Sequence, residues 1–315
     1  MMLYCYPKFV RSSGLGNRLF PWARSVLFAE RYKARSLPPR WVSLRRGPLL
    51  RGGSLSGGVP VAHVTGKLLL IGNFTPPTLA EQVLRARILA RARIVSEDAF
   101  DPTVLAEGGQ GRDTVVQFEQ YGAMFADVKG QSELLLRRLR EVVRPGIRLA
   151  VDASDVPPIV LNVRGASDFK PARSASELIA RGGVQTPLSW FRAVLQRLRD
   201  MSGADVPAIV VSDVSDAALA ELLSMKNVRR CKTRYALEDL LTLARAKVII
   251  GSGGSSFTAW GAFLAQAHVI TVQGQSLTWF NLDAASDGCV VAWSVDVTET
   301  PHAERIAHAI QAVPR

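Results

Sequence analysis

The sequence predicts an α/β protein of two lobes, and three observations support this fold class. The chain has 315 residues, a length that fits two domains of roughly 150 residues better than one core. Hydrophobic residues make up 48% of the chain, which is enough for packed cores. From about residue 156 onward, short β-rich runs alternate with helical segments, as in a parallel sheet wrapped by helices. We therefore expect lobes at residues 1–155 and 156–300.

The second lobe is the more regular one. Thr186 and Pro187 make a good N-cap and first turn, and the apolar residues that follow recur at helical spacing until Gly203. The same kind of pattern predicts helices at 216–225 and 237–246. Strands are expected at 159–163, 207–212, 227–231, 248–250, 268–272 and 289–293. This alternation predicts a doubly wound sheet.

The first lobe is less regular, and a loop rich in proline, glycine and arginine occupies 36–58. Prolines and a glycine interrupt the periodicity at 144–158, where we place a hinge. A cleft between the two lobes is then the default place for a ligand. The last segment, 301–315, carries a helical pattern and could dock back on the first lobe. Expected elements of this lobe are a strand at 3–6, helices at 17–32 and 131–143, and strands at 61–64, 67–71 and 115–118.

The chain is strongly basic, with a formal net charge of +12 and a pI near 10.2. Such a charge invites an anionic partner: nucleic acid, acidic lipid headgroups or phosphorylated small molecules. Arginines concentrate at 85–93 and 137–148, where they form a solvated helix face or, as an alternative, a surface that meets an anionic membrane. No aromatic residues are interleaved with them, and no zinc-finger or RNA-recognition signature occurs. Nucleic acid is therefore disfavoured.

The sequence lacks the marks of several other classes of protein. No run of about 18 apolar residues occurs, and the N-terminus lacks the pattern of a signal peptide. We expect a cytoplasmic protein, with peripheral contact at the inner face of the membrane as an option. Three cysteines without Cys-x-x-Cys spacing argue against a disulfide framework or a zinc site. Four histidines without ligand spacing, and the lack of any Asp-x-Asp tripeptide, predict that no metal is bound.

A glycine-rich loop follows the strand expected at 248–250 and precedes an apolar helical segment. In Gly251-Ser-Gly-Gly-Ser-Ser256 the glycines remove side-chain bulk, and the first-turn amides of the helix point free N–H groups at whatever docks there. Ser255 and Ser256 add hydroxyl groups, and the positive end of the helix favours an anion. Such loops are common, so a plain structural turn is the alternative. The loop lacks the Gly-Lys-Ser/Thr of a P-loop.

Two further stretches place polar groups where a ligand would meet them. Gly14 and Gly16 let a backbone approach closely at the start of the first helix, and Asn17 caps that helix or hydrogen-bonds a ligand. Arg164 ends an apolar strand, and the carboxyl ends of strands carry ligands in open α/β sheets. Its planar guanidinium suits a diphosphate. Asp168, four residues on, is a general base or holds Arg164 in a structural ion pair.

Four segments, in the same order along the chain, resemble motifs of the fucosyltransferase superfamily that joins α-1,2-, α-1,6- and protein O-fucosyltransferases. The resemblance is in particular to the bacterial α-1,2 type, family 11. The first two segments are Gly14-Leu-Gly-Asn-Arg-Leu-Phe20 and Asn162-Val-Arg-Gly-Ala-Ser-Asp168. The third is Val210-Val-Ser-Asp213, and the fourth runs from Asp239 to Ala262 and contains Ser255-Ser-Phe257. A weaker likeness at 118–121 extends the match over most of the chain.

This resemblance implies a GT-B fold of two Rossmann-like lobes, an inverting mechanism without a metal or cofactor, and GDP-fucose as donor. Arg164 would bind the β-phosphate and stabilise the leaving GDP, and Asp239 would face guanine. Asp168 is our general base, with Glu177 in reserve. The other positions that the resemblance places at the donor are Gly14, Gly16, Asn17, Asn162, Ser212, Asp213, Ser255, Ser256 and Phe257.

The expected function is transfer of a sugar, in first place fucose, to a hydroxyl of a glycan acceptor in surface polysaccharide or glycolipid synthesis. Asn162 stands where the family has histidine, and Ser167 lengthens the interval between Arg164 and Asp168 by one residue. Transfer from another nucleotide sugar is therefore one alternative. A catalytically inactive GT-B-like protein that binds glycans is the other.

Overall fold

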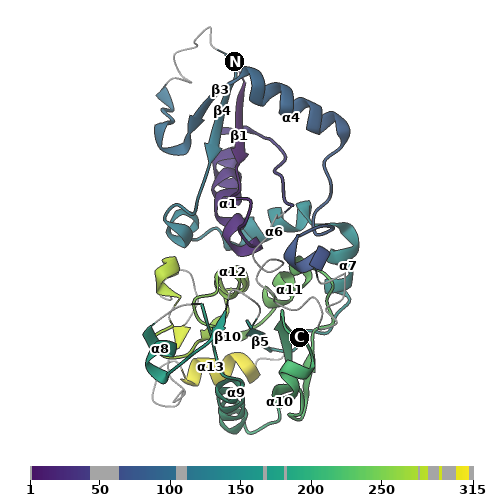
Figure 1. Cartoon of the computed structure of the whole chain (residues 1–315), viewed down its shortest axis with the longest axis vertical. Helices are drawn as coiled ribbons and strands as arrows, with labels where there is room; N and C mark the ends of the chain where they lie inside the picture. The colour runs from purple at the N-terminus through teal and green to yellow at the C-terminus, as the bar shows by residue number, and fades with distance from the viewer. Residues whose placement is uncertain are drawn as a thin grey trace.

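A computed structural model shows two α/β lobes stacked along the long axis of the molecule, each built on its own parallel sheet (Figure 1). This confirms the predicted fold class of two Rossmann-like lobes, the GT-B arrangement. The exact boundary between the lobes stays a prediction. The structure describes residues 2–42, 64–103, 112–165, 169–180, 183–275, 277–282, 291–292 and 303–311.

The second lobe carries a six-stranded parallel sheet in the order β12-β11-β10-β5-β8-β9. The chain enters at β5, runs outward through β8 and β9, then returns to β10 and runs outward on the other side. This is the 3-2-1-4-5-6 order of dinucleotide-binding sheets, and it reverses between β5 and β10. The strands are β5 (Ile159–Val163), β8 (Ala208–Ser212), β9 (Val228–Arg230), β10 (Val248–Gly251), β11 (His268–Ile270) and β12 (Val291–Ala292).

Helices cover both faces of this sheet, because the side chains of each strand alternate between the faces. Ile159 and Leu161 lie in a core shared with α9, α10 and α13, whereas Val160 lies in the core shared with α11 and α12. The helices are α9 (Leu188–Ser202), α10 (Ala220–Leu223), α11 (Ala236–Leu243), α12 (Ser256–Ala265) and α13 (Ala303–Gln311).

Helix α13 packs on the second lobe. Ile306 and Ile310 lie in the same core as residues of α9, and α13 contacts α9 and β10. The expectation that this helix docks back on the first lobe is therefore wrong. An amphipathic pattern identifies the face of a helix that becomes buried, but not the surface that covers it.

The first lobe carries a four-stranded parallel sheet in the order β2-β1-β4-β3, with one long helix on each face. Phe28 of α1 packs with Cys5 on one face, and Ile88 of α4 packs with Tyr4 on the other. The strands are β1 (Leu3–Pro7), β2 (Arg35–Ser36), β3 (Arg93–Ser96) and β4 (Thr114–Phe118). The helices of this part of the chain are α1 (Leu15–Tyr32), α4 (Leu79–Arg91), α6 (Ser132–Val142) and α7 (Pro145–Asp152).

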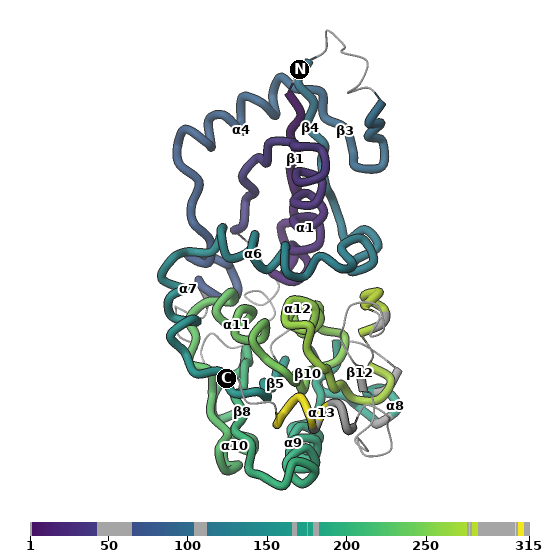
Figure 2. Tube along the Cα trace, turned by 180° about the vertical axis from the view of Figure 1, so that it is seen from behind, coloured from purple at the N-terminus to yellow at the C-terminus, as the bar shows by residue number. Residues whose placement is uncertain are grey.

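The two lobes share one apolar core. Helices α1 and α6 contact α12, and α7 contacts α11, so that α6, α11 and α12 lie where the two lobes meet (Figure 2). The ring of Trp260 in α12 lies 5.1 Å from that of Phe20 in α1 and 4.8 Å from that of Phe125, between centroids. Nε1 of Trp260 also donates to the carbonyl of Gly16 at 2.8 Å. Burial of this apolar surface favours one relative position of the lobes.

Two local predictions are wrong. The run at 67–71 is not a strand, because Val64–Leu68 forms a π-helical turn. Thr186 does not cap α9; the N-cap is Pro187, and Thr186 is buried. Pro145 begins α7 within 144–158, since proline is tolerated in the first turn of a helix, and the hinge expected there stays a prediction.

The remaining described elements are short, and the predicted helix at 216–225 is split into a 3-10 turn followed by α10. Most of the loop at 36–58 and of the runs at 61–64 and 289–293 lies outside the described residues. Among the helices that the structure describes, none is long and apolar enough to cross a membrane. The short elements are β6 (Lys170–Pro171), β7 (Val184–Gln185), α8 (Ala175–Ala180) and 3-10 turns at Glu97–Ala99, Met124–Val128, Ala217–Leu219 and Thr278–Phe280.

Candidate functional site

A cavity of about 360 Å³ lies between the lobes at the carboxyl edge of the second sheet. The residues that follow β5 and β10 form part of its wall, at the point where the strand order reverses. Open parallel sheets bind ligands at this point. Asp168 lies outside the described residues, and Glu177, the reserve base, does not line this cavity, but every other predicted catalytic or donor-binding residue does. They are Gly14, Gly16, Asn17, Asn162, Arg164, Ser212, Asp213, Asp239, Ser255, Ser256 and Phe257.

The guanidinium of Arg164 forms an ion pair with Asp213 in the cavity wall. Nη1 of Arg164 lies 2.5 Å from Oδ2 of Asp213, and Oδ1 of the same carboxylate accepts the N–H of Gly165 at 3.0 Å. The side chain of Arg164 is 21% exposed and that of Asp213 is 8% exposed. The ring of Phe169 lies 5.5 Å from the guanidinium carbon, within cation–π range. Asp213 therefore holds the guanidinium of Arg164 in place, a role that the sequence suggested for Asp168.

The glycine-rich loop ends at the N-terminus of α12, beside the cavity. Ser255 is the N-cap of this helix, and its Oγ accepts the N–H of Thr258 at 3.2 Å. Gly254 has φ of +66°, the left-handed conformation that favours glycine. Ser256 and Phe257 follow in the first turn and line the cavity. The loop thus presents a helix N-terminus to the cavity, and the hydroxyl of Ser255 accepts from that helix while its own proton can be donated.

Two polar side chains of the wall are bonded within the protein. Nδ2 of Asn162 donates to Oγ1 of Thr258 at 2.8 Å, which ties the end of β5 to α12. Oγ of Ser212 donates to the carbonyl of Val163 at 2.7 Å, which ties β8 to β5. Both side chains therefore brace the wall, and their direct contact with a donor stays a prediction.

Gly16 and Asn17 bring the first lobe into the cavity. Nδ2 of Asn17 donates to the hydroxyl of Tyr121 at 3.3 Å. Gly16 lies against the first turn of α12, where a β-carbon built on it would be 2.6 Å from Oγ of Ser256. Position 16 thus requires glycine because the N-terminal ends of α1 and α12 approach so closely.

We expect Gly16→Ala to destabilise the protein by about 1–3 kcal/mol, because the added methyl group overpacks the contact between the lobes. Urea unfolding at equilibrium measures the change. The control is Gly146→Ala, since a β-carbon on Gly146 meets no atom within 4 Å. If Gly16→Ala unfolds at the same urea concentration as the unaltered protein, the lobes do not meet this closely in solution.

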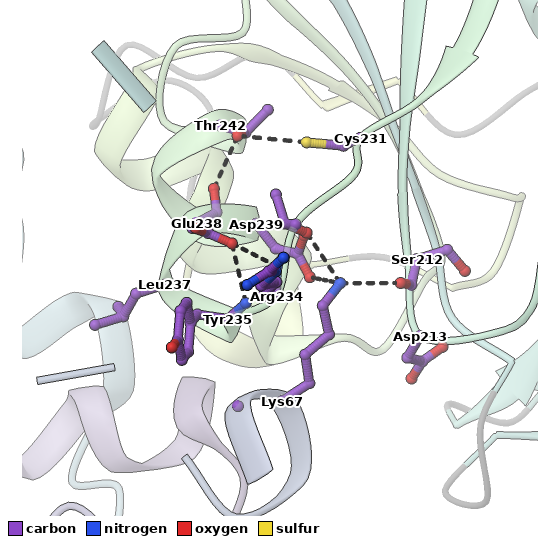
Figure 3. Close-up of polar contacts among 12 residues, drawn as sticks. Lys67, Ser212, Asp213, Cys231, Arg234, Tyr235, Leu237, Glu238, Asp239 and Thr242 are labelled. Atoms are coloured by element: carbon purple, nitrogen blue, oxygen red, sulfur yellow. Dashed lines mark hydrogen bonds and ion pairs between the residues drawn. The ribbon is translucent and has the colours of Figure 1, made fainter. Parts of the chain in front are cut away.

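A buried ion pair between Lys67 and Asp239 forms another part of the wall (Figure 3). Nζ of Lys67 lies 2.7 Å from Oδ2 of Asp239, and the two side chains are only 8% and 7% exposed. Nζ also donates to Oγ1 of Thr233 at 3.0 Å, and that hydroxyl donates to the second carboxylate oxygen of Asp239. The sequence indicated Asp239 but missed Lys67, whose segment has the composition of a strand.

The turn that carries Lys67 is docked on the start of α11. Oδ1 of Asn73 accepts the N–H of Leu237 at 2.8 Å, and its Nδ2 donates to the carbonyl of Gly66 at 2.5 Å. The side chain of Asn73 is fully buried. It therefore supplies a first-turn acceptor to α11 from outside the helix, which fixes residues 64–73 against the second lobe.

Burial raises the pKa of the Cys231 thiol to about 11, and the negative charge of Asp239 adds to this effect. The thiol is therefore protonated at neutral pH and is a poor nucleophile. Across the described ranges of the chain, no three His, Cys, Asp or Glu side chains are grouped so that they could hold a metal ion.

Glu177, the reserve general base, is not among the residues that line the cavity. Its carboxylate accepts the N–H of Arg173 at 2.7 Å, at the start of α8. Aromatic residues that the sequence did not indicate do line it, namely Phe169, Trp279 and Phe280. Trp279 is 53% exposed, so its ring offers a surface to a sugar. These rings lie in loops and short turns, and no local pattern places such segments in space.

Comparison with known proteins gives a remote similarity in structure only. No protein-family model matches the sequence, and no curated protein matches it. The solved fucosyltransferase NodZ from Bradyrhizobium is 17% identical, with a TM-score of 0.45 over 84% of this chain and 94% of that one. POFUT1 in complex with GDP is 12% identical, with a TM-score of 0.46 over 82% and 93%. A variant of FUT1 from Arabidopsis thaliana in complex with GDP is 12% identical, with a TM-score of 0.45 over 86% and 70%.

Proposed function

We propose that this protein is an inverting, metal-independent glycosyltransferase that moves a sugar, in first place fucose from GDP-fucose, to a hydroxyl group of a glycan acceptor. The main support is that Arg164 and the N-terminus of α12 meet in one cavity between the lobes, where the strand order reverses. A guanidinium and a helix N-terminus both bind phosphate well. Together they suit the diphosphate of a nucleotide sugar.

The reaction breaks the bond between C1 of the sugar and an oxygen of the diphosphate. The acceptor hydroxyl attacks C1 from the opposite side, its proton passes to a base, and the nucleoside diphosphate leaves with the bonding electrons. Negative charge develops on the leaving diphosphate, so Arg164 and the first-turn amides of α12 bind the transition state more strongly than the ground state. Asp213 holds the guanidinium in place for this task.

The proton acceptor in this proposal is Asp168, for its position four residues after Arg164. It lies outside the described residues, so its place is argued from the sequence alone. Glu177 is set aside because its carboxylate accepts a backbone N–H in its own segment.

Lys67 and Asp239 support a guanine nucleotide as the donor. Guanine presents the acceptor O6 on the same side of the base as donor N–H groups, whereas cytosine presents an amino donor in place of O6. The ammonium of Lys67 and the carboxylate of Asp239, 2.7 Å apart in the cavity wall, offer a donor and an acceptor side by side. This arrangement complements guanine, and through O4 and N3–H also uracil, but not cytosine, so the comparison with UDP compounds below decides between the two bases.

We place the activity in the cytoplasm, with peripheral contact at the inner face of the membrane, in the synthesis of surface polysaccharide or glycolipid. The formal net charge of +12 supports attraction to anionic lipid. An acceptor carried on a lipid would be reached at that surface.

A thermal-shift screen of nucleotides and nucleotide sugars tests the donor. We expect GDP and GDP-fucose to raise the unfolding midpoint more than UDP, CMP or ADP compounds, because a ligand stabilises the fold by RT ln(1 + [L]/Kd). A ligand at 100 times its Kd contributes about 2.7 kcal/mol. If UDP compounds stabilise the protein more than guanosine compounds, the donor assignment is wrong.

Donor hydrolysis separates an enzyme from a binding protein. We expect slow release of GDP from GDP-fucose in the absence of acceptor, because water can replace the acceptor hydroxyl. A protein that is stabilised by a nucleotide sugar but never releases the nucleotide would be a binding module.

A further inference from the structure

A second hollow, of about 870 Å³, lies in the first lobe at the carboxyl edge of its sheet. Residues that follow β1 and β2 line it together with side chains from α4 and from the start of α7. Among the described residues that line it, there is no aspartate and no glutamate. Six basic side chains do so: Lys8, Arg11, Arg18, Arg40, Arg85 and Arg144. We call this hollow the basic groove.

Two of these arginines are built into the floor of the basic groove. Arg85 is 7% exposed, and its Nη1 donates to the carbonyl of Pro38 at 2.8 Å. Arg18 is 1% exposed, and its guanidinium donates to main-chain carbonyls, among them those of Ser13 at 3.0 Å and Trp41 at 2.7 Å. Main-chain carbonyls therefore hold both guanidinium groups in the floor of the groove.

The rim of the basic groove carries exposed arginines, and its wall is aromatic. Arg40 and Arg144 are both exposed, and Nε of Arg144 donates to the carbonyl of Phe74 at 3.3 Å. The ring of Trp41 stacks on that of Phe74 with centroids 3.8 Å apart, and the ring of Phe9 lies 4.8 Å from Trp41. The groove thus combines apolar ring edges with guanidinium groups, a combination that suits a sugar bearing an anionic group.

The basic groove lies next to the cavity between the lobes. Asn17 lines the cavity, and the next residue, Arg18, lines the groove. Likewise, Leu68 lines the cavity and Leu70 lines the groove. Consecutive Cα atoms are about 3.8 Å apart, so the walls of the groove and of the cavity meet at these segments. In addition, the carboxyl edge of a parallel sheet is the usual place for a ligand.

We propose that the basic groove binds an acidic oligosaccharide, namely a glycan acceptor whose sugars carry carboxylate groups. The proposal rests on the glycosyl transfer proposed above, which requires an acceptor beside the donor cavity. A guanidinium binds a carboxylate through two parallel hydrogen bonds, which gives the groove both affinity and orientation. A concave hollow of this volume admits a short oligosaccharide, whereas a bilayer or a nucleic acid duplex presents a convex or flat surface that cannot enter it.

Titration calorimetry with trigalacturonic acid tests the proposal, and its fully methyl-esterified form is the matched neutral probe. We expect the acid to bind at least about tenfold more tightly than the ester, because only the carboxylates of the acid form charge-assisted pairs with the guanidinium groups. The double variant Arg40→Glu, Arg144→Glu should lose that preference. Arg87→Glu is the control, because Arg87 is exposed on α4 but does not line the groove.

Three results would overturn the proposal: equal affinity for acid and ester, no binding of either, or the same loss in Arg87→Glu as in the double variant. Binding of anionic vesicles or duplex DNA that depends on Arg40 and Arg144, without binding of the trisaccharide, would assign the groove to another class of partner. The thermal shift with GDP separates this proposal from the proposed function. We expect the double variant to keep it, because neither arginine lines the donor cavity.

Discussion

Replacing Arg164 by alanine is expected to lower the rate of sugar transfer by about 10²–10³-fold, the usual effect of removing one preorganised donor from a charged transition state. Asp213 holds the guanidinium at 2.5 Å before any donor binds, so little reorganisation is needed during the reaction. The loss should appear in kcat as well as in kcat/KM, because the charge that Arg164 stabilises develops only in the transition state. Steady-state release of GDP from GDP-fucose measures it.

Arg164→Lys is the matched variant for this experiment. Lysine keeps the positive charge but lacks the planar fork that can contact Asp213 and a phosphate oxygen at once, so we expect an intermediate rate. Thermal unfolding of both variants shows whether the fold persists, since Arg164→Lys gives the largely buried carboxylate of Asp213 a weaker partner and Arg164→Ala removes its ion-pair partner. A folded Arg164→Ala protein that turns over at the unaltered rate would remove Arg164 from the mechanism.

Much of the second lobe could be predicted from the sequence, because its central strands are continuous apolar runs. Every residue of β5, β8 and β10 is buried, and such strands have no alternation that could be misread. The candidate site follows from the same feature. Polar residues placed directly after parallel strands, such as Arg164 and Asp213, are brought to one edge of the sheet by the fold itself.

The partners of these residues could not be predicted, because they depend on contacts between distant segments. Asp213 pairs with Arg164 only because β5 and β8 are neighbours in the sheet. Lys67 reaches Asp239 because Asn73 bonds the backbone of Leu237, which lies 164 residues further along the chain. Local apolar composition at 67–71 favoured a strand, and tertiary contacts overrode it.

Replacing Lys67 by methionine is expected to destabilise the protein by about 3–5 kcal/mol, the effect of leaving a buried charge without its partner. The carboxylate of Asp239 is 7% exposed, and the change leaves it with the hydroxyl of Thr233. Methionine keeps an unbranched apolar stem, so the packing changes little. Urea unfolding gives the free energy of unfolding.

The control for this prediction is Lys226→Met. Lys226 and Asp205 also form a lysine–aspartate pair in the second lobe, at 2.5 Å, but their side chains are 75% and 48% exposed. Exposed pairs contribute little, so we expect a loss below about 1 kcal/mol. Equal losses in the two variants would show that the pair of Lys67 and Asp239 is not buried in solution.

The double variant Lys67→Met, Asp239→Leu separates stability from donor binding. With both charges gone, no buried charge remains to be desolvated, so most of the lost stability should return. GDP binding should stay weak in the double variant, because the ammonium of Lys67 and the carboxylate of Asp239, which face guanine in our proposal, are both absent. A double variant that binds GDP normally would show that the base is not read by this pair. Lys67 belongs to the first half of the chain and Asp239 to α11. If the double variant is stable but still fails to bind GDP, residues from both halves of the chain select the nucleotide.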